Sequence, residues 1–204
     1  IAAVPTVASY ILPLKLKQFC ELYPVADIHM LTSNTSDIIE RVMNGDVDFG
    51  FVKGSVPYTE IESVTICTDP IILVINASHP WAQKEFVTPA DFAEESAPVL
   101  PLNRQSIFWS GIMEWFAQHS VQPRIEMEFD HVETIKQMMF FNGGIAFVPL
   151  CSVSEELRIG RLKEVTLNPP LQLSRVTVLI VNKKKPLNPA AKLFLEYMKT
   201  QSET

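Results

Sequence analysis

Two short polar segments of this sequence have the composition of an anion-binding site. Thr6-Val7-Ala8-Ser9 follows the apolar run Ile1–Val4, and Ser33-Asn34-Thr35 precedes an amphipathic run. Hydroxyls and free backbone N–H groups at the beginning of a helix can bind a carboxylate or another anion. The alternative is that Thr6 and Thr35 only cap their helices.

The residues after Asn34 predict a helix followed by a buried strand. Thr35 or Ser36 can cap this helix, and Asp37 favours its positive N-terminal end. Gly45 suits the left-handed position that ends a helix. The helix has one apolar face, formed by Ile38, Ile39, Val42 and Met43. A mostly apolar strand over 47–52 follows, with Val47, Phe49, Phe51 and Val52.

The first segment belongs to a unit of the same kind. Residues 1–4 begin a strand, residues 10–23 predict a helix ended by Pro24, and residues 25–31 predict the next strand. This β-α-β-α-β order with short connections predicts parallel strands joined by right-handed crossovers. Thr6 and Thr35 should then lie at the C-terminal edge of one sheet, where open α/β sheets bind ligands.

The rest of the chain predicts a second α/β subdomain. Strands are expected at 61–66 and 71–75, with a break at Thr68-Asp69-Pro70. They are followed by a capped helix near 88–92, strand 98–102, helix 107–119, strand 124–129, helix 132–141, strand 145–148, helix 152–159, strands 162–167 and 173–181, and helix 189–198. We expect residues 1–76 with 175–204 to form subdomain I and residues 77–174 to form subdomain II, with a cleft between them.

Composition excludes several functions for the chain itself. Its 204 residues carry a formal net charge of −6, which does not suit binding to nucleic acid phosphates. The three cysteines, Cys20, Cys67 and Cys151, are scattered, so we expect reduced thiols, no metal site and a cytoplasmic protein. No apolar run is long enough to span a membrane. The chain begins inside a strand, which predicts further residues upstream.

Four segments resemble the effector-binding domain of LysR-type transcriptional regulators, and together they cover essentially the whole chain. They are Pro5–Pro13, Asn34–Val52 with its Gly45-Asp46-Val47-Asp48 motif, Ala77-Ser78-His79-Pro80-Trp81-Ala82, and Gly143-Gly144-Ile145-Ala146-Phe147-Val148-Pro149. Trp81 stands where the family usually has leucine, and Gly144 shifts the family's glycine pattern.

The resemblance implies a type 2 periplasmic-binding-protein-like α/β fold, with two Rossmann-like subdomains joined by two crossover strands. It implies a small-molecule effector between the lobes, an N-terminal winged helix-turn-helix that binds DNA and is absent from this chain, and possible contact with RNA polymerase. It also implies a homodimer of this domain, through the helices at 14–23 and 107–119, and a tetramer of the full-length protein.

The resemblance also assigns effector-site residues by position. From the first lobe these are Thr6, Val7, Ala8, Asn34 and Thr35, with Phe51 as a wall of the cleft. From the second lobe they are Asn103, Arg104, Gln105, Phe129, His131 and Pro149. The planar guanidinium of Arg104 can hold a carboxylate in two hydrogen bonds. The alternatives are a surface arginine and a helix-capping His131.

Two other classes of function remain as alternatives. A free-standing solute-binding protein of a transport system would use the same fold, but we would then expect a secretory signal, and residues 1–4 read instead as the start of a strand. An enzyme would need a catalytic constellation. The sequence has no nucleophile elbow, phosphate loop or metal-ligand cluster, and its four histidines are isolated. We therefore expect a binding domain without a cofactor, which shifts a conformational equilibrium when its effector binds.

Overall fold

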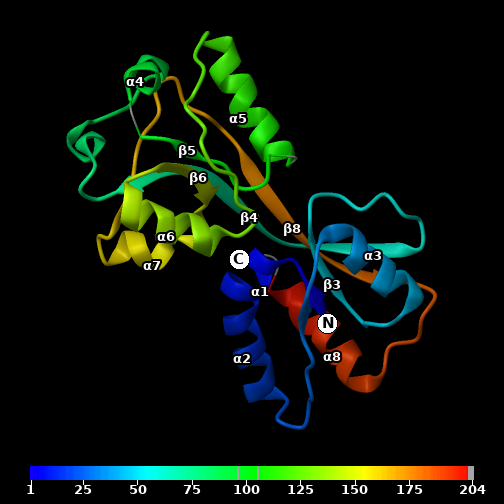
Figure 1. The fold of residues 1–204 in the computed structure, drawn as a ribbon. Coiled ribbons are helices and arrows are strands. Elements are labelled where there is room, and N and C mark those ends of the chain that lie inside the picture. Colours follow the sequence, from blue (N-terminus) through cyan, green and yellow to red (C-terminus); the bar gives the residue numbers. More distant parts are fainter. Residues whose placement is uncertain (96, 105, 202–204) are drawn as a thin grey trace. The chain divides into compact units, whose positions relative to one another are not determined.

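The computed structural model describes residues 1–95, 97–104 and 106–201, which form two compact α/β units. The first contains residues 1–69 and the chain from Arg175 onward, and the second contains residues 70–174. Strand β4 (Ile61–Asn76) leads from the first unit into the second, and β8 (Ser174–Asn182) leads back. The boundary predicted at 76/77 falls at the end of β4. Figure 1 shows the elements of each unit.

The first unit has a mixed sheet with the strand order β2-β1-β3-β8-β4. Its shorter strands are β1 (Ala2–Ala3), β2 (Leu31–Thr32) and β3 (Gly50–Lys53), and its helices are α1 (Pro5–Tyr10), α2 (Leu12–Leu22), α3 (Thr35–Asn44) and α8 (Pro189–Thr200). Strand β1 pairs with β2 and β3 in parallel, whereas β3 pairs with β8 in antiparallel. The parallel pairing predicted for the first three strands is confirmed.

Aromatic side chains form the centre of the first unit's core. Phe19 of α2 contacts Phe194 of α8 with 5.0 Å between ring centroids, so these two helices lie side by side. Phe194 also contacts Phe49 and Phe51, at 5.3 and 6.3 Å. Of the apolar positions predicted along the helix at 10–23, Leu12 and Phe19 are buried as expected, whereas Leu14 and Leu22 are exposed. Ile11 divides that helix into α1 and α2.

The N-cap of α3 lies one residue before Thr35, the first of the two predicted caps. The Asn34 side chain is the N-cap and accepts a hydrogen bond from the Asp37 N–H at 3.0 Å, so Thr35 is the first helical residue. Asn is as effective a cap as Ser or Thr, which is why sequence alone did not separate them. Gly45 ends the helix with φ of 74°, as predicted.

The second unit has a smaller sheet in which β6 (Ile145–Pro149) lies between β4 and β5 (Val99–Leu100). Strand β6 is antiparallel to β4 and parallel to β5, and β7 (Leu162–Glu164) pairs with β4. The helices are η1 (Pro80–Gln83), α4 (Pro89–Glu94), α5 (Ile107–Gln118), α6 (Val132–Asn142), η2 (Leu150–Ser152) and α7 (Ser154–Arg158). Thr88 precedes α4, and its N–H and hydroxyl donate to the Asp91 carboxylate.

Three strand predictions were wrong. Residues 124–129 form only one bridge, between Phe129 and Leu102, because Pro101 has no N–H with which to continue a ladder. The strand expected at 25–31 is reduced to β2 at the edge of the sheet. Strand β4 continues through Pro70, and its pairing with β6 begins at Ile71, so the proline interrupts no hydrogen bond between these two strands.

Among the described helices, none is long and apolar enough to cross a lipid bilayer.

Candidate functional site

The C-terminal ends of β1, β2 and β3 meet at one edge of the first unit. The Ser33 N–H donates to the Ala3 carbonyl at 3.2 Å, and the Val4 N–H donates to the Phe51 carbonyl at 3.0 Å. The segments that follow these strands therefore begin close together. This is the edge at which sequence analysis placed Thr6 and Thr35, and parallel strands bind ligands at such edges.

Thr6 lies in the first turn of α1 and is buried. Val7 and Ala8 are buried in the hydrophobic core, and their N–H groups both donate to the Val4 carbonyl at 3.0 Å. Of these three predicted residues, Thr6 is the one whose hydroxyl can offer a hydrogen bond. Val7 and Ala8 form the packed base on which it rests.

Asn34 and Thr35 begin α3, next to the same edge. Asn34 is exposed and Thr35 half-buried. Asp37 follows in the first turn, where its carboxylate accepts a hydrogen bond from Arg41 Nε at 2.8 Å. This hydrogen bond holds the pKa of Asp37 below its usual value. The pair with Arg41 offsets part of the negative charge that Asp37 would present to an anion at the helix N-terminus.

Phe51 is fully buried in the core of the first unit, where it packs against Phe194. Its backbone borders the strand edge through the hydrogen bond from Val4, whereas its ring points into the core cluster. The Phe51 side chain thus lies in the core, beneath the strand edge that its backbone borders. Lys53, at the end of β3, is half-buried.

The second unit brings its predicted residues to a corresponding edge. Leu102 bridges Phe129 in parallel, and the Asn103 N–H donates to the Phe129 carbonyl at 2.8 Å. Asn103 has a φ of 55°, in the left-handed region that asparagine tolerates better than most residues. This turn directs the chain from β5 toward the beginning of α5. Strained positions of this kind cluster at functional sites.

Arg104 follows in the same turn and is exposed. Its N–H donates to Glu128 Oε1 at 2.9 Å, which fixes the backbone. No salt bridge to its guanidinium comes from residues 1–95, 97–104 or 106–201. Ser106 then caps α5, its hydroxyl accepting from the Trp109 N–H at 3.2 Å. Gln105, also predicted for the site, lies outside the described residues.

Phe129, His131 and Pro149 complete the predicted set in the second unit. Phe129 and His131 are half-buried, and His131 is the N-cap residue of α6. Pro149 is buried at the end of β6, and its carbonyl accepts a hydrogen bond from the Ser152 hydroxyl at 2.6 Å. The ends of β5 and β6 and the beginning of α6 therefore carry these residues.

A buried lysine behind Pro149 was missed by sequence analysis. Lys136 of α6 is only 4% exposed, and its ammonium lies 2.7 Å from Glu133 and 2.6 Å from Glu156 of α7. It also donates to the Ser152 carbonyl at 3.1 Å. The spacing of Glu133 and Lys136 on one helix was the available signal, but the partner on α7 could not be inferred locally. Lys136 fixes the turn that follows Pro149.

Each unit offers polar side chains that follow the C-terminal ends of its strands, with an arginine in the second unit. Hydroxyl, amide and guanidinium groups of this kind are hydrogen-bond donors. Among the described residues, no group of His, Cys, Asp or Glu side chains could hold a metal ion.

Comparison with known proteins identifies the family. The sequence model of the LysR substrate binding domain matches residues 1–203. The chain belongs to this family. A curated relative is a probable RuBisCO transcriptional regulator of Cyanophora paradoxa, 28% identical over 211 residues, which cover 98% of this chain and 63% of the relative. The chain thus spans a little under two thirds of that relative's length.

Solved structures show the same fold. The regulatory domain of Synechocystis CcmR, in complex with 2-PG, has a TM-score of 0.79 at 20% identity and covers 99% of this chain and 95% of its own. The effector binding domain of QuiR, in complex with shikimate, has a TM-score of 0.75 at 20% identity, with coverages of 99% and 95%. The predicted type 2 periplasmic-binding-protein-like fold of this LysR domain is confirmed.

Proposed function

We propose that this LysR domain senses a small organic anion and thereby controls a transcriptional regulator of which it is one part. The observation that carries this proposal is the convergence of Thr6, Asn34 and Thr35 at the shared C-terminal edge of β1, β2 and β3. The family match adds support, because curated relatives are transcriptional regulators.

An anion is the best ligand for the groups at these edges. Helix α3 begins beside the first edge, so its N-terminal dipole end and the Thr35 hydroxyl favour negative charge. Arg104 adds a planar guanidinium in the second unit. The similar QuiR domain was solved with shikimate, a carboxylic acid, and the CcmR domain was solved with 2-PG.

The proposed roles follow from where each residue lies. Thr6, Asn34 and Thr35 hydrogen-bond the effector from the first unit, and Asn103, Arg104 and His131 contact it from the second. Phe129 supplies an apolar contact, and Gln105 remains a predicted ligand. Val7, Ala8, Phe51 and Pro149 shape the walls and hold the polar groups in place. In this proposal the effector binds between the units and shifts their equilibrium.

The proposal for the whole protein includes partners beyond this chain. We place it in the cytoplasm as a homodimer of this domain and a tetramer at full length, with DNA bound by an N-terminal winged helix-turn-helix and RNA polymerase as a further contact. Exposed apolar side chains on α2 suit the dimer, because water-exposed leucines are stabilised by burial in an interface.

A binding screen tests the effector site. Thermal unfolding is measured with small carboxylates and phosphate esters, including shikimate and 2-PG, for the wild type, Thr35→Ala and Arg104→Gln. A ligand at a hundredfold excess over its Kd should stabilise the wild type by about 2.7 kcal/mol. Both variants should lose most of this effect, whereas Thr59→Ala and Arg124→Gln, at exposed positions, should keep it. Stabilisation unchanged in Thr35→Ala and Arg104→Gln would refute the site.

A further inference from the structure

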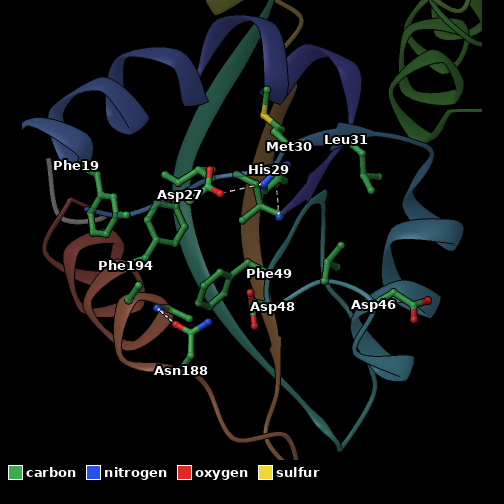
Figure 2. Close-up of a pocket in the computed structure, with 16 residues that line it drawn as sticks. Phe19, Asp27, His29, Met30, Leu31, Asp46, Asp48, Phe49, Asn188 and Phe194 are labelled. Carbon is green, nitrogen blue, oxygen red and sulfur yellow. Dashed lines mark hydrogen bonds and ion pairs between the residues drawn. The ribbon is translucent and has the colours of Figure 1, made fainter. Parts of the chain in front are cut away.

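A cavity of about 340 Å³ lies in the first unit, at the end of its strands opposite to the proposed effector edge. Ile1 and Phe49 both line it, and each directly precedes a strand, β1 or β3. Thr6 and Asn34 instead follow the C-terminal ends of strands. The volume is within the range of about 300 to 1,000 Å³ that small-molecule sites occupy. Figure 2 shows the side chains around this cavity.

One wall of the cavity is aromatic. Phe19, Phe49 and Phe194 all line it and are almost fully buried. The ring of Phe194 links the other two, with centroids 5.0 Å from Phe19 and 5.3 Å from Phe49. In Figure 2 these rings lie beside one another, away from Asp46. The wall can hold an aliphatic or aromatic body and can attract a cation through the ring faces.

The charged side chains that line the cavity are mostly acidic. Asp27, Asp46 and Asp48 all line it. Two of these acids have a basic residue close by. Asp27 Oδ2 lies 3.2 Å from His29 Nε2, and the Lys185 side chain lies over Gly45, the residue that precedes Asp46. Asp48 forms no salt bridge within the part of the chain that the structure describes. Its carboxylate lies next to Phe49, so it can meet a ligand whose apolar body rests on the aromatic wall.

A further contact argues against a negatively charged ligand in the cavity. The Asn188 side chain accepts from the Ala191 N–H at 2.8 Å, so a residue of the chain already caps the positive end of α8 at this cavity. The carboxylates of Asp27, Asp46 and Asp48 around the cavity would also repel an anion and attract a cation.

We propose that this cavity binds a small organic cation, whose ammonium group lies beside Asp48 and Asp27 and whose apolar body lies against Phe19, Phe49 and Phe194. The site is separate from the effector edge and takes a ligand of the opposite charge. Both ligands can therefore be bound at the same time, and the cation site does not depend on the identity of the effector.

Three probes of similar size and different charge test the proposal by calorimetry at pH 7. They are phenethylammonium, the neutral 2-phenylethanol and the anion 3-phenylpropionate. The cation should bind about fivefold tighter than the alcohol, as expected for an ammonium that meets exposed carboxylates. The anion should bind more weakly than the alcohol. Equal affinities for the three probes, or no binding of the cation, would overturn the proposal.

Variants locate the site. Asp48→Asn should remove most of the preference for phenethylammonium over 2-phenylethanol, because only Asp27 then remains beside the ammonium, whereas Glu40→Gln, at an exposed acid on α3, should leave the preference unchanged. Ala190→Trp should block the cavity, because Ala190 lines it from the exposed first turn of α8. Thr35→Ala should still bind the cation, so this result separates the cavity from the effector site. Cation binding that survives both Asp48→Asn and Ala190→Trp would place it elsewhere and refute the assignment.

Discussion

Individual residues of the proposed effector site were predictable where a local pattern fixed their position. Asn34 and Thr35 lie at a helix beginning that the sequence shows directly, through the apolar face and Gly45 that follow. Whether a side chain points to solvent or into the core depends on neighbours that are distant in sequence. Phe51 therefore proved to belong to the core, where it meets Phe194.

A buried ion pair of the first unit should be sensitive to loss of its acid. Asp69 of β4 and Arg175 of β8 lie 3.2 Å apart, and Arg175 is only 1% exposed. Asp69→Asn should lower the free energy of unfolding by about 3 kcal/mol, since it removes the Asp69 charge that lies against a buried guanidinium. Urea titration measures this. The double variant Asp69→Asn/Arg175→Met should recover part of the loss, and a double variant less stable than the single one would contradict the explanation.

His79 should make stability depend on pH. It is buried, its Nδ1 accepts from the Trp81 N–H at 3.1 Å, and burial lowers its pKa from 6.5, with Glu95 acting in the opposite direction. The unfolded chain therefore takes up the proton first. The contribution of neutral His79 is complete above pH 6.5 and is lost as the pH falls through the window below it.

The midpoints of urea unfolding, measured from about pH 8 to about pH 5, test this expectation, because this range includes the ordinary histidine pKa. The matched variant is His79→Asn, because an asparagine side-chain oxygen can accept the same Trp81 N–H and does not titrate. The wild type should lose stability relative to His79→Asn as the solution becomes acidic. Parallel pH profiles for the two proteins would show that His79 is not responsible.

At the scale of elements, helices were predicted better than strands. The apolar face and terminal glycine of α3 are visible in sequence because they all lie within one short stretch of the chain. The strand expected at 124–129 needed a partner, and Pro101 in that partner has no N–H to offer. The cation cavity was not predictable for the same reason, since α2, the residues before β3 and α8 form it together.

The cap of α3 allows stability and effector binding to be separated. Asn34→Ala should lower the free energy of unfolding by about 1 kcal/mol, because the Asp37 N–H loses its acceptor. Asn34→Asp keeps an acceptor and should leave stability nearly unchanged, but its charge should weaken binding of an anionic effector. Thermal unfolding and calorimetry measure the two effects. If Asn34→Asp bound the effector as tightly as the wild type, Asn34 would not face the ligand.

At the scale of the whole molecule, the repeated β-α pattern predicted two α/β units because each repeat specifies a strand, a crossover and a return. The units themselves follow from which strands pair. Residues 61–69 of β4 belong to one unit and residues 70–76 to the other, and the pairing with β6 begins at Ile71. A pattern read along one strand shows its apolar residues without showing where its partner changes.

The exposed apolar residues of the first unit predict that the domain associates with a second copy of itself. Helix α2 exposes Leu14 and Leu22, each 63% accessible, and Val25 beyond it is 98% accessible. Strand β2 is the edge strand of the first unit's sheet, and its Leu31 is also exposed. Exposed apolar side chains on a helix and an open sheet edge each favour association with a second copy of the chain.

Leu14→Glu should therefore convert a dimer of this domain into a monomer, because a carboxylate buried in the interface would have to be desolvated without a partner. Sedimentation velocity at several protein concentrations measures the change. Leu193→Glu is the matched control, since Leu193 is also an exposed leucine on a helix but lies on α8. Dissociation by Leu14→Glu alone would place the interface at α2. Dissociation by Leu193→Glu alone would move it to α8 and leave the exposed leucines of α2 for another partner.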